Sequence, residues 1–402
     1  MVFLSITHTK HEKVLIDQMI AFCKEVFTEK FVEFSTSPPT FLRTFIFTLQ
    51  VTSQNHVYEF VCKSSLKVDE EGLNSMEDWM RDSFFKSLVT FTLINQLHLS
   101  LFPTMVAYNE ELFLIIMNKI KGISLDSILL ADTSTEIEDY LLDFSNNLAV
   151  LHGKTASDAV FNDYIDLMHR FGFQDRKKIP SWFRGSLKTV DKLKDLLSSE
   201  GFELPNTFYK SLKDLFQTAE SSNFLSIIHS DPCPDNVILN NDGLFFVDVD
   251  TVEFYYFFID VAYFEIFFPS CWCVGIIPER TQKKMREKYF ETINKYITID
   301  WSTYYTNAFI GSVLYAVVNL VIYFNEYNGK KMIDKNKWGI DSIYNRIKTR
   351  HEIIINRGTN FPEFKEVVDG FQLFRNLFQT KYGNSEGLKE YPVFSQENKI
   401  KD

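Results

Sequence analysis

Apolar positions in the first third of the chain follow first a helical and then a strand pattern. Apolar residues at near-helical spacing predict a helix within the first 30 residues, namely Val14, Leu15, Met19, Ile20, Phe22 and Cys23. β-Branched and aromatic runs at 44–51 and 57–62 predict a hairpin, because polar turn residues separate them. Further apolar runs predict strands at 31–34 and 112–117 and a long helix at about 76–97. We therefore expect a small β-rich lobe with one long helix.

A polar break at 118–122 separates this part from a longer region in which the apolar spacing is helical. One exception lies within that region. Two short apolar runs at 236–250 flank Asn241-Asp242-Gly243, which predicts a second hairpin. The predicted fold class is α+β with two lobes, a β-rich N-terminal lobe and a larger, mainly helical C-terminal lobe that carries this hairpin.

The predicted boundaries follow from the same patterns. We expect an N-terminal lobe at 1–117, a hinge at 118–122 and a C-terminal lobe at 123–380, with a helical insert at about 153–226. Residues 381–402 are polar and are expected to form a loosely held tail.

Two apolar stretches raise the question of a membrane span. The stretch 254–268 contains Asp260 and Glu265, and the stretch 309–324 contains Asn319. A transmembrane helix needs about 20 consecutive apolar residues. We therefore expect both stretches to be buried in the core, with no membrane span.

Charge and cysteine usage narrow the class of protein. A formal net charge of −11 argues against a nucleic-acid-binding protein, which usually carries a basic face. The 5 cysteines are scattered, and no Cys or His pair accompanies Cys271 and Cys273 at metal-ligand spacing. Free, buried thiols and a reducing compartment are therefore expected. The first residues lack the basic segment of a signal peptide, so we expect a cytoplasmic protein.

The chemistry concentrates in 229–236, His-Ser-Asp-Pro-Cys-Pro-Asp-Asn, which has the H-x-D-x-x-x-x-N spacing of a kinase catalytic loop. If the hairpin turn is centred on Asp242, Asn236 and Asp248 face each other across the strands, and their oxygens can share a divalent ion. Asp231 would accept a hydroxyl proton beside that ion. The alternative is that Asp231 begins a turn and Asp248 is a surface acid, but an unpaired acid after an apolar strand is poorly solvated.

Several blocks together resemble one known family, the aminoglycoside phosphotransferases and choline kinase-like proteins. The block 228–239 resembles the catalytic block of the family. Further blocks follow in the family's order: the hinge strand and glycine turn at 114–125, the Leu-x-x-Leu-His helix end at 148–152, and Asp260-Val261-Ala262 where the family has Asp-Leu-Ala. The stretch 268–274 is similar to a bacterial subgroup. The resemblance covers about residues 40–275 and is not specific for a substrate.

The resemblance implies a bilobal, protein-kinase-like fold that uses ATP and Mg²⁺. It implies that Asp231 is the catalytic base, that Asn236 and Asp248 are magnesium ligands, and that Lys63 contacts the α- and β-phosphates. It also implies that Asp260 braces the catalytic loop and that His229 is a hydrogen-bonding support. The adenine edge would be read by the backbone of Met117, Asn118, Lys119 and Ile120. For Lys63 the alternative is a strand-end lysine that reaches into water.

The sequence departs from the family pattern at four points. The helix acid that should pair with Lys63 is missing near Ser87, and we select Asp82 on the same helix for that role. No glycine stands between Met1 and Gly72, so a glycine-rich phosphate loop is absent. Ser230 replaces the family's usual glycine. Asp250 follows Asp248 at an unfamiliar spacing, and we expect it beside the metal ligands or at the surface.

The acceptor is expected to be a small molecule with a hydroxyl group. Aromatic residues of the insert could line its pocket, but such residues at helical spacing usually pack in a core: Phe161, Tyr164, Phe171, Phe173, Trp182 and Phe183. The preferred hypothesis is an ATP- and magnesium-dependent O-phosphotransferase. The alternatives are a nucleotide-binding pseudokinase that acts as an interaction protein, and a kinase with a protein or lipid acceptor.

Overall fold

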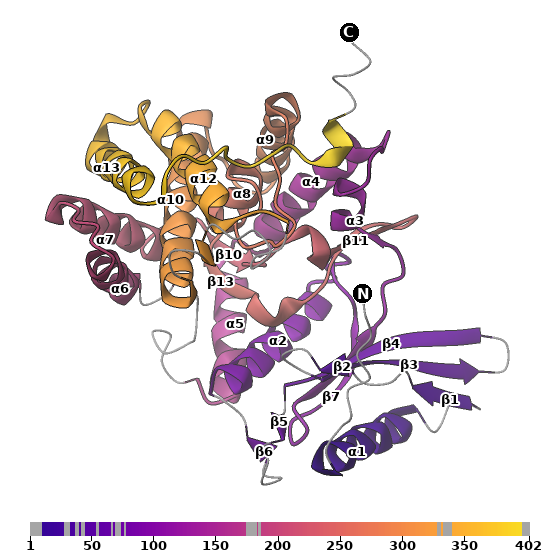
Figure 1. Cartoon of the computed structure of the whole chain (residues 1–402). Helices are drawn as coiled ribbons and strands as arrows, with labels where there is room; N and C mark the ends of the chain where they lie inside the picture. The colour runs from indigo at the N-terminus through magenta and orange to yellow at the C-terminus, as the bar shows by residue number, and fades with distance from the viewer. Residues whose placement is uncertain are drawn as a thin grey trace. The chain divides into compact units, whose positions relative to one another are not determined.

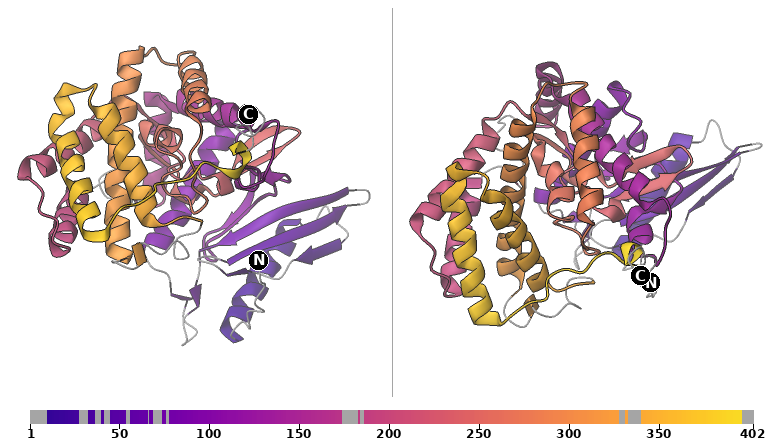
Figure 2. Two further views of the ribbon diagram at one scale, coloured as in Figure 1. Left: turned by 45° about the horizontal axis from the view of Figure 1, so that its top comes forward. Right: turned by 90° about the horizontal axis from the view of Figure 1, so that it is seen from above.

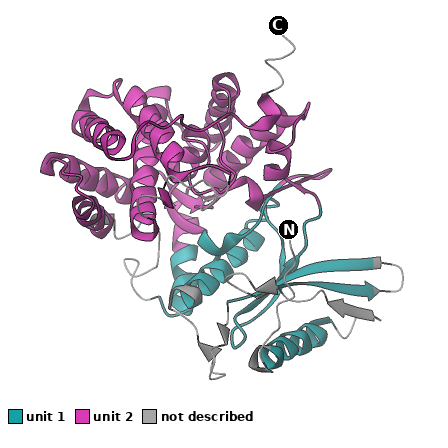
Figure 3. Ribbon diagram, in the orientation of Figure 1, with its two compact units in different colours: residues 1–121, 163–180, 245–251 teal, residues 122–162, 181–244, 252–402 magenta. Residues whose placement is uncertain are grey.

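The computed structural model describes residues 10–27, 33–36, 40–41, 45–53, 56–65, 67–68, 74–75, 78–173, 183, 186–327, 331–332 and 340–395. The chain forms two compact units (Figure 3). Unit 1 contains 1–121, 163–180 and 245–251, and unit 2 contains the remaining residues. The sequence analysis assigns two of these segments, 163–180 and 245–251, to the C-terminal lobe, whereas they belong to unit 1.

Unit 1 is built on an antiparallel sheet with the strand order β1-β3-β4-β8-β7. Its strands are β1 (Glu33–Thr36), β3 (Phe45–Ser53), β4 (His56–Ser64), β8 (Leu114–Asn118) and β7 (Met105–Asn109), and β2 (Thr40–Phe41) pairs with β3. A separate short pair joins β5 (Lys67–Val68) to β6 (Asn74–Ser75). The β3–β4 pairing, with Ser53 opposite His56, confirms the predicted hairpin, and its turn lies outside the described residues.

The helix α1 (Lys10–Phe27) covers one face of this sheet (Figure 2). Alternate residues of β3 point into the shared core, because successive side chains of a strand face opposite sides. This core contains Leu15, Met19, Cys23 and Phe27 from the helix and Phe47, Leu49 and Val51 from the strand. The predicted N-terminal helix is confirmed, although Val14 is exposed rather than buried.

The helix α2 (Asp78–Gln96) lies within the range predicted for the long helix. Its apolar residues Phe84, Leu88 and Phe91 are buried. The short helix η3 (Val249–Thr251) contacts α2, and the Ser83 hydroxyl donates to the Asp250 carbonyl oxygen at 3.1 Å. These contacts place the residues after the second hairpin against α2.

Unit 2 is mainly helical (Figure 1). Its helices are α3 (Leu125–Leu129), α4 (Ile137–Thr155), α6 (Ser186–Ser199), α7 (Asn206–Glu220), α8 (Phe258–Glu265), α9 (Glu279–Ile293), α10 (Trp301–Glu326), α12 (Ile343–Gly358) and α13 (Lys365–Tyr382). The helix α5 (Asp158–Arg170) begins in unit 2 and ends in unit 1. The sheet of unit 1 and the helices of unit 2 confirm the predicted α+β class.

Short strands flank the predicted catalytic block. The strand β10 (Leu225–Ile228) pairs antiparallel with β13 (Glu253–Tyr256). The strand β11 (Val237–Asn240) lies between β9 (Ile123–Ser124) and β12 (Gly243–Phe246), so the predicted second hairpin is present. Gly122 precedes β9 in close contact with β11, where an added Cβ would lie 2.2 Å from the Leu239 carbonyl oxygen.

Among the described residues, one helix is long and apolar enough to cross a membrane, and this helix is α10. However, 83% of the apolar 18-residue stretch of this helix is buried inside the protein. Its Gly311 lies so close to α8 that an added Cβ would be 2.2 Å from the Phe258 carbonyl oxygen. The stretch 309–324 is thus a core helix, as predicted.

The insert aromatics also pack in the core, as favoured above. Phe161 contacts Phe254 with ring centroids 5.0 Å apart, and Phe171 stacks on Phe85 at 5.2 Å. Phe183 is 1% exposed. Trp182 lies outside the described residues.

The prediction of a loosely held tail is wrong for residues 383–395. Apolar side chains of this segment are buried: Leu388, Tyr391, Val393 and Phe394. The Ile276 amide donates to the Lys389 carbonyl at 2.8 Å, and the Tyr391 ring contacts Phe268. The prediction relied on the overall polar composition of the segment and did not weigh its few apolar residues, which are the ones that pack in the core.

The buried imidazole of His351 on α12 predicts a pH-dependent stability. Burial, together with the charges of Arg350 and Arg375, lowers the pKa of His351 to about 3. The unfolded chain therefore binds a proton near pH 6.5 that the folded chain does not bind. We expect the free energy of unfolding to fall by about 1.3 kcal/mol between pH 7.5 and 5.5 from this group alone.

Chemical denaturation at both pH values measures this effect as the difference between the wild type and His351→Leu. The leucine variant removes the titrating group and keeps apolar contact with Phe371 and Phe374. An equal loss of stability in both proteins over this pH range would contradict the assignment.

Candidate active site

The buried carboxylate of Asp260 holds the predicted catalytic loop at its start. Pairing of β10 with β13 brings Ile228 opposite Glu253, and Asp260 follows in the first turn of α8. Its two oxygens accept the backbone amides of His229 at 2.7 Å and Ser230 at 2.9 Å. The His152 ring completes the set with Nε2 at 3.2 Å from Asp260. The His229 ring makes none of these contacts, since it is the His229 amide that Asp260 binds.

Ser230 has a left-handed backbone conformation, with φ of 66°. This region is uncommon for a residue with a side chain, which explains why glycine is usual at this position of the resembled family. The Ser230 carbonyl accepts a hydrogen bond from the Tyr315 hydroxyl at 3.1 Å, and the Tyr263 hydroxyl oxygen lies 2.9 Å from it. These bonds and the Asp260 contact hold the strained residue in place.

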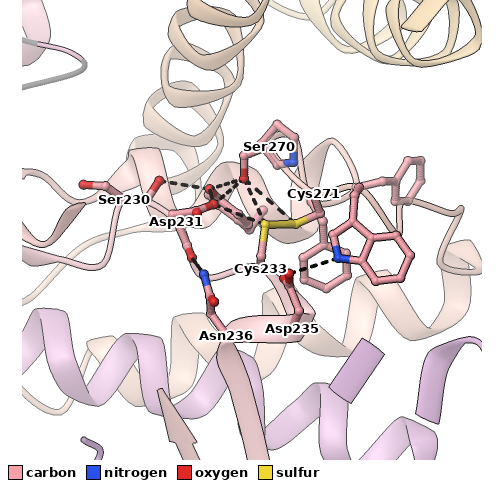
Figure 4. Close-up of a disulfide and its surroundings, with 12 residues drawn as sticks. Ser230, Asp231, Cys233, Asp235, Asn236, Ser270 and Cys271 are labelled. Carbon is pink, nitrogen blue, oxygen red and sulfur yellow. Dashed lines mark hydrogen bonds between the residues drawn. A yellow bond between two sulfur atoms is a disulfide. The ribbon is translucent and has the colours of Figure 1, made fainter. Parts of the chain in front are cut away.

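The carboxylate of Asp231 is held through one of its two oxygens (Figure 4). Its Oδ1 accepts from Ser270 Oγ at 2.5 Å and from Tyr263 Oη at 3.0 Å. The other oxygen, Oδ2, has no hydrogen-bond partner within the described part of the chain. The carboxylate is therefore oriented, and one oxygen remains available.

The tyrosine hydroxyls near Asp231 remain protonated donors. Burial, with the charge of Asp231 as the next cause, raises the pKa of Tyr263 and the pKa of Tyr315 well above the ordinary range. The two hydroxyls lie 2.6 Å apart. The hydroxyls of Tyr263 and Tyr315 are therefore neutral groups near the Asp231 carboxylate, and Tyr263 can donate a hydrogen bond to it.

Asn236 is the last residue of the short helix η2 (Pro234–Asn236), and its side chain folds back on the loop. Its Nδ2 donates to the Asp231 carbonyl oxygen at 3.0 Å (Figure 4). This bond fixes the amide orientation, so that Oδ1 is the oxygen left for a ligand.

A disulfide joins Cys233 of this loop to Cys271 (Figure 4). The expectation of free thiols is therefore wrong for these two residues, while Cys23, Cys62 and Cys273 are free and buried. Sequence spacing cannot reveal such a pairing, because the partners are 38 residues apart and meet only in the folded chain. The Cys233 sulfur lies 3.2 Å from Asp231 Oδ1.

In unit 1, the ammonium group of Lys63 binds two carboxylates. Its Nζ lies 2.6 Å from an oxygen of Asp248 and 2.6 Å from an oxygen of Asp250. Burial alone would lower the pKa of Lys63, but the charges of Asp250 and Asp248 raise it above the ordinary value. Lys63 is thus a fixed cation at the end of β4, and not a lysine reaching freely into water.

The predicted pairing of Lys63 with Asp82 is wrong. Among the described residues, the ion pairs of Lys63 are with Asp248 and Asp250. Ser87, the position at which the family pattern places the helix acid, has its hydroxyl 3.5 Å from Asp250 Oδ1. Asp250 therefore supplies from a distant part of the chain the carboxylate that α2 lacks.

The hairpin differs in detail from its prediction. Asn241 and Asp242 alone connect β11 to β12, so the turn is not centred on Asp242. Asn236 precedes β11, and Asp248 follows β12 with a left-handed φ of 61°, so neither residue lies within the paired strands. Their sharing of one metal ion stays a prediction.

The predicted hinge residues lie at the end of β8, an inner strand of the sheet. The Asn118 amide donates to the Thr104 carbonyl at 3.0 Å, and the Lys119 amide donates to the Glu59 carbonyl at 3.0 Å. Met117 is opposite Val61 in β4 and Met105 in β7. The amides of Asn118 and Lys119 are thus hydrogen-bonded within unit 1, and the reading of an adenine edge by residues 117–120 stays a prediction.

No protein-family model and no curated protein matches the sequence. Solved structures do match. Choline kinase from Cryptosporidium parvum Iowa II is 11% identical, with a TM-score of 0.50 over 89% of this chain and 99% of that chain. Amicoumacin kinase in complex with AMP-PNP, Ca²⁺ and Ami is 10% identical, with a TM-score of 0.52 over 87% of this chain and 96% of that chain. The chain has the fold of the choline kinase-like family. The predicted resemblance is confirmed at the level of the fold.

Besides the disulfide, two features of this kinase-like chain were missed by the sequence analysis. One is the hydroxyl pair on Asp231, formed by Tyr263 and Ser270. The other is the ion pair between Lys63 and Asp250. Tyr263 lies on the same helix as Asp260, and Ser270 lies in the block similar to a bacterial subgroup, so both stood near identified motifs. The absence of an acid near Ser87 was the one sign in the sequence that Lys63 has its carboxylate partner elsewhere, at Asp250.

Proposed function

We propose that this protein is an ATP- and magnesium-dependent phosphotransferase that moves the γ-phosphoryl group to a hydroxyl of a small molecule. The kinase-like fold supports phosphotransfer in general. The observation that carries the proposal is the half-held carboxylate of Asp231, whose Oδ1 is bound by Ser270 and Tyr263. Asp231 Oδ2 accepts the proton of the acceptor hydroxyl as the new bond to phosphorus forms.

The oxygen chemistry of the two proposed ligands, Asn236 and Asp248, supports magnesium as the metal. Asn236 keeps its amide oxygen available, and the Asp248 side chain is 46% exposed. Magnesium prefers such hard oxygen ligands and usually keeps several waters. When bound by Asn236 and Asp248, Mg²⁺ supplies charge neutralisation to the phosphates. Lys63 binds the α- and β-phosphates as a fixed cation, and Asp250 keeps it in position.

The acceptor class is supported by the names of the similar structures, a choline kinase and an amicoumacin kinase. Both names describe kinases of small molecules. The pseudokinase alternative rested on two features, the absent glycine-rich loop and the missing acid partner of Lys63. The structure bears on the second of them. Because Asp250 and Asp248 bind Lys63, that argument for a degenerate enzyme no longer holds.

Thermal shift with nucleotide tests the binding part of this proposal. We expect ATP with Mg²⁺ to raise the melting temperature more than ATP with EDTA, because ligand binding to the folded state stabilises it by mass action. Asn236→Ala removes the metal-dependent part of the shift and retains the rest. A shift that is the same with and without Mg²⁺ would contradict the proposed metal ligands.

Asp250→Asn tests the new partner of Lys63. Asparagine keeps the shape of the side chain and removes its charge, and a hydrogen bond to a charged group contributes about 1.5–3 kcal/mol. We therefore expect kcat/KM for ATP to fall about 10- to 100-fold, measured by coupled ADP release. Addition of Ser87→Glu, which supplies a carboxylate from α2, should restore part of the loss.

Asp82→Asn is the matched control for this experiment. It removes the same charge from the acid on α2 that the sequence favoured, and we expect a change in kcat/KM below about twofold. A large loss in Asp82→Asn together with a small loss in Asp250→Asn would reverse the assignment.

A further inference from the structure

The loop that follows α8, residues 266–273, is anchored from behind by side chains of two helices. We call it the anchored loop. Arg350 of α12 donates to the carbonyl oxygens of Ile266, Phe267 and Phe268 at 3.2, 3.3 and 3.2 Å. Arg346 of α12 binds the carbonyls of Cys271 and Trp272, and Asn319 of α10 donates to the Pro269 carbonyl at 3.0 Å. All three anchoring side chains are buried.

The backbone of the anchored loop is unusual. Phe267 and Phe268 have left-handed φ values of 59° and 44°. Bulky residues occupy this region only when the surrounding structure forces them to do so. The arginine hydrogen bonds to their carbonyls provide that constraint. The backbone of the anchored loop is therefore held by side chains of α10 and α12, which lie outside the catalytic loop.

The front of the anchored loop holds the catalytic loop at two adjacent residues (Figure 4). Ser270 donates to Asp231 Oδ1 at 2.5 Å. Cys271, the next residue, is bonded to Cys233, whose sulfur lies 3.1 Å from Ser270 Oγ and 3.2 Å from Asp231 Oδ1. A covalent link thus stands directly beside the hydrogen bond that orients the proposed base.

Between residues 231 and 236, the backbone hydrogen bonds of the catalytic loop join residues of the loop to one another. The Cys233 amide donates to the Asp231 carbonyl at 2.8 Å, and the Asn236 amide donates to the Cys233 carbonyl at 2.8 Å. The link from Trp272 Nε1 to Asp235 Oδ2, at 3.0 Å, joins the two loops through a side chain that is 42% exposed. The disulfide is the strong connection between the loop that carries Asp231 and the anchored loop.

We propose that the Cys233–Cys271 disulfide makes phosphoryl transfer dependent on thiol redox state, with Ser270 as the positioning residue through which it acts. The intact disulfide keeps Ser270 hydrogen-bonded to Asp231, and its reduction releases the catalytic loop and lowers turnover. This inference rests on the proposed function. A displacement of about 1 Å at a reacting group costs up to 10²-fold in rate, so a small release suffices.

The redox step is an ordinary exchange with a dithiol. A thiolate of dithiothreitol attacks one sulfur of the disulfide, and its second thiol then closes the oxidised ring. The S–S bond breaks, and two electrons and two protons pass from the dithiol to Cys233 and Cys271. A cellular dithiol reductant would carry out the same exchange.

The experiment compares wild type, Cys271→Ala and the matched control Cys273→Ala, each before and after dithiothreitol. Cys273 is also buried in the anchored loop but is not bridged. We expect reduction to lower kcat of the wild type about tenfold with KM for ATP unchanged, because the disulfide acts on the base rather than on nucleotide binding. Cys271→Ala should be slow and insensitive to dithiothreitol, and Cys273→Ala should respond as the wild type does.

Ser270 is tested separately from the disulfide. We expect Ser270→Ala to lower kcat at unchanged KM for ATP, and Ser270→Thr, which keeps the hydroxyl, to recover most of the loss. If Ser270 had only a structural role, the alanine and threonine variants would not differ in kcat in this way. Equal kcat values for alanine and threonine variants would overturn the role of Ser270.

Hydrogen exchange of the 231–236 segment gives a readout that does not need activity. We expect reduction to speed exchange of the Cys233 and Asn236 amides in wild type and in Cys273→Ala. Unchanged exchange, after mass spectrometry has shown the disulfide open, overturns the inference. Absence of turnover in both redox states, with faster exchange on reduction, instead removes the proposed function and leaves the structural clamp established.

Discussion

Replacement of Asp231 by asparagine is expected to reduce kcat about 10²- to 10⁴-fold, the range that a positioned general base contributes. Asparagine has the same shape and can still accept from Ser270 and Tyr263, so the loop keeps its hydrogen bonds. It cannot take a proton from the acceptor hydroxyl. Steady-state ADP release in the presence of a hydroxyl acceptor measures the loss.

The binding of nucleotide separates a catalytic loss from a folding loss. We expect the thermal shift of Asp231→Asn with ATP and Mg²⁺ to equal that of the wild type, since Asp231 is not assigned to the nucleotide. A loss of both turnover and nucleotide binding would indicate damage to the site, and unchanged turnover would remove Asp231 as the base.

Removal of the Asp260 carboxylate is expected to cause the largest loss of stability. Asp260→Ala leaves the buried amides of His229 and Ser230 without an acceptor and also removes the partner of His152. An unsatisfied buried polar group costs about 1–3 kcal/mol, so we expect the free energy of unfolding to fall by roughly 3–5 kcal/mol. Urea denaturation measures this change.

Two further variants provide losses of stability with which that of Asp260→Ala can be compared. Asp260→Asn keeps one oxygen acceptor and should lose less stability than the alanine variant. Asp300→Ala removes an exposed carboxylate that caps α10 through the Thr303 amide, and we expect the smallest loss of the three. If Asp260→Ala were no more destabilising than Asp300→Ala, the proposed bracing of the catalytic loop would be incorrect.

Features carried by local pattern were predicted well. The β3–β4 hairpin follows from alternating residues around a polar turn, and α1 and α10 follow from apolar spacing. The expectation that Asp260 braces the catalytic loop came from the family resemblance rather than from spacing. These features need only short-range rules or a matched motif.

Features that depend on distant residues were missed. Lys63 meets Asp250 only because η3 packs against α2, and the sequence pointed instead to the nearer Asp82. Cys233 and Cys271 meet only in the folded chain, in which the α12 arginines bind the backbone carbonyls of the anchored loop. Both contacts join segments that are far apart in the sequence, and no local pattern encodes them.

The most direct test of the central claim follows the phosphoryl group itself. Wild-type protein is incubated with Mg²⁺, ATP labelled in its γ-phosphate and a panel of small hydroxyl compounds, and the products are separated. The account predicts label on the hydroxyl oxygen of at least one compound, in an amount equal to the ADP formed, and almost none with Asp231→Asn. Release of label only as free phosphate, or equal labelled product from both proteins, would contradict it.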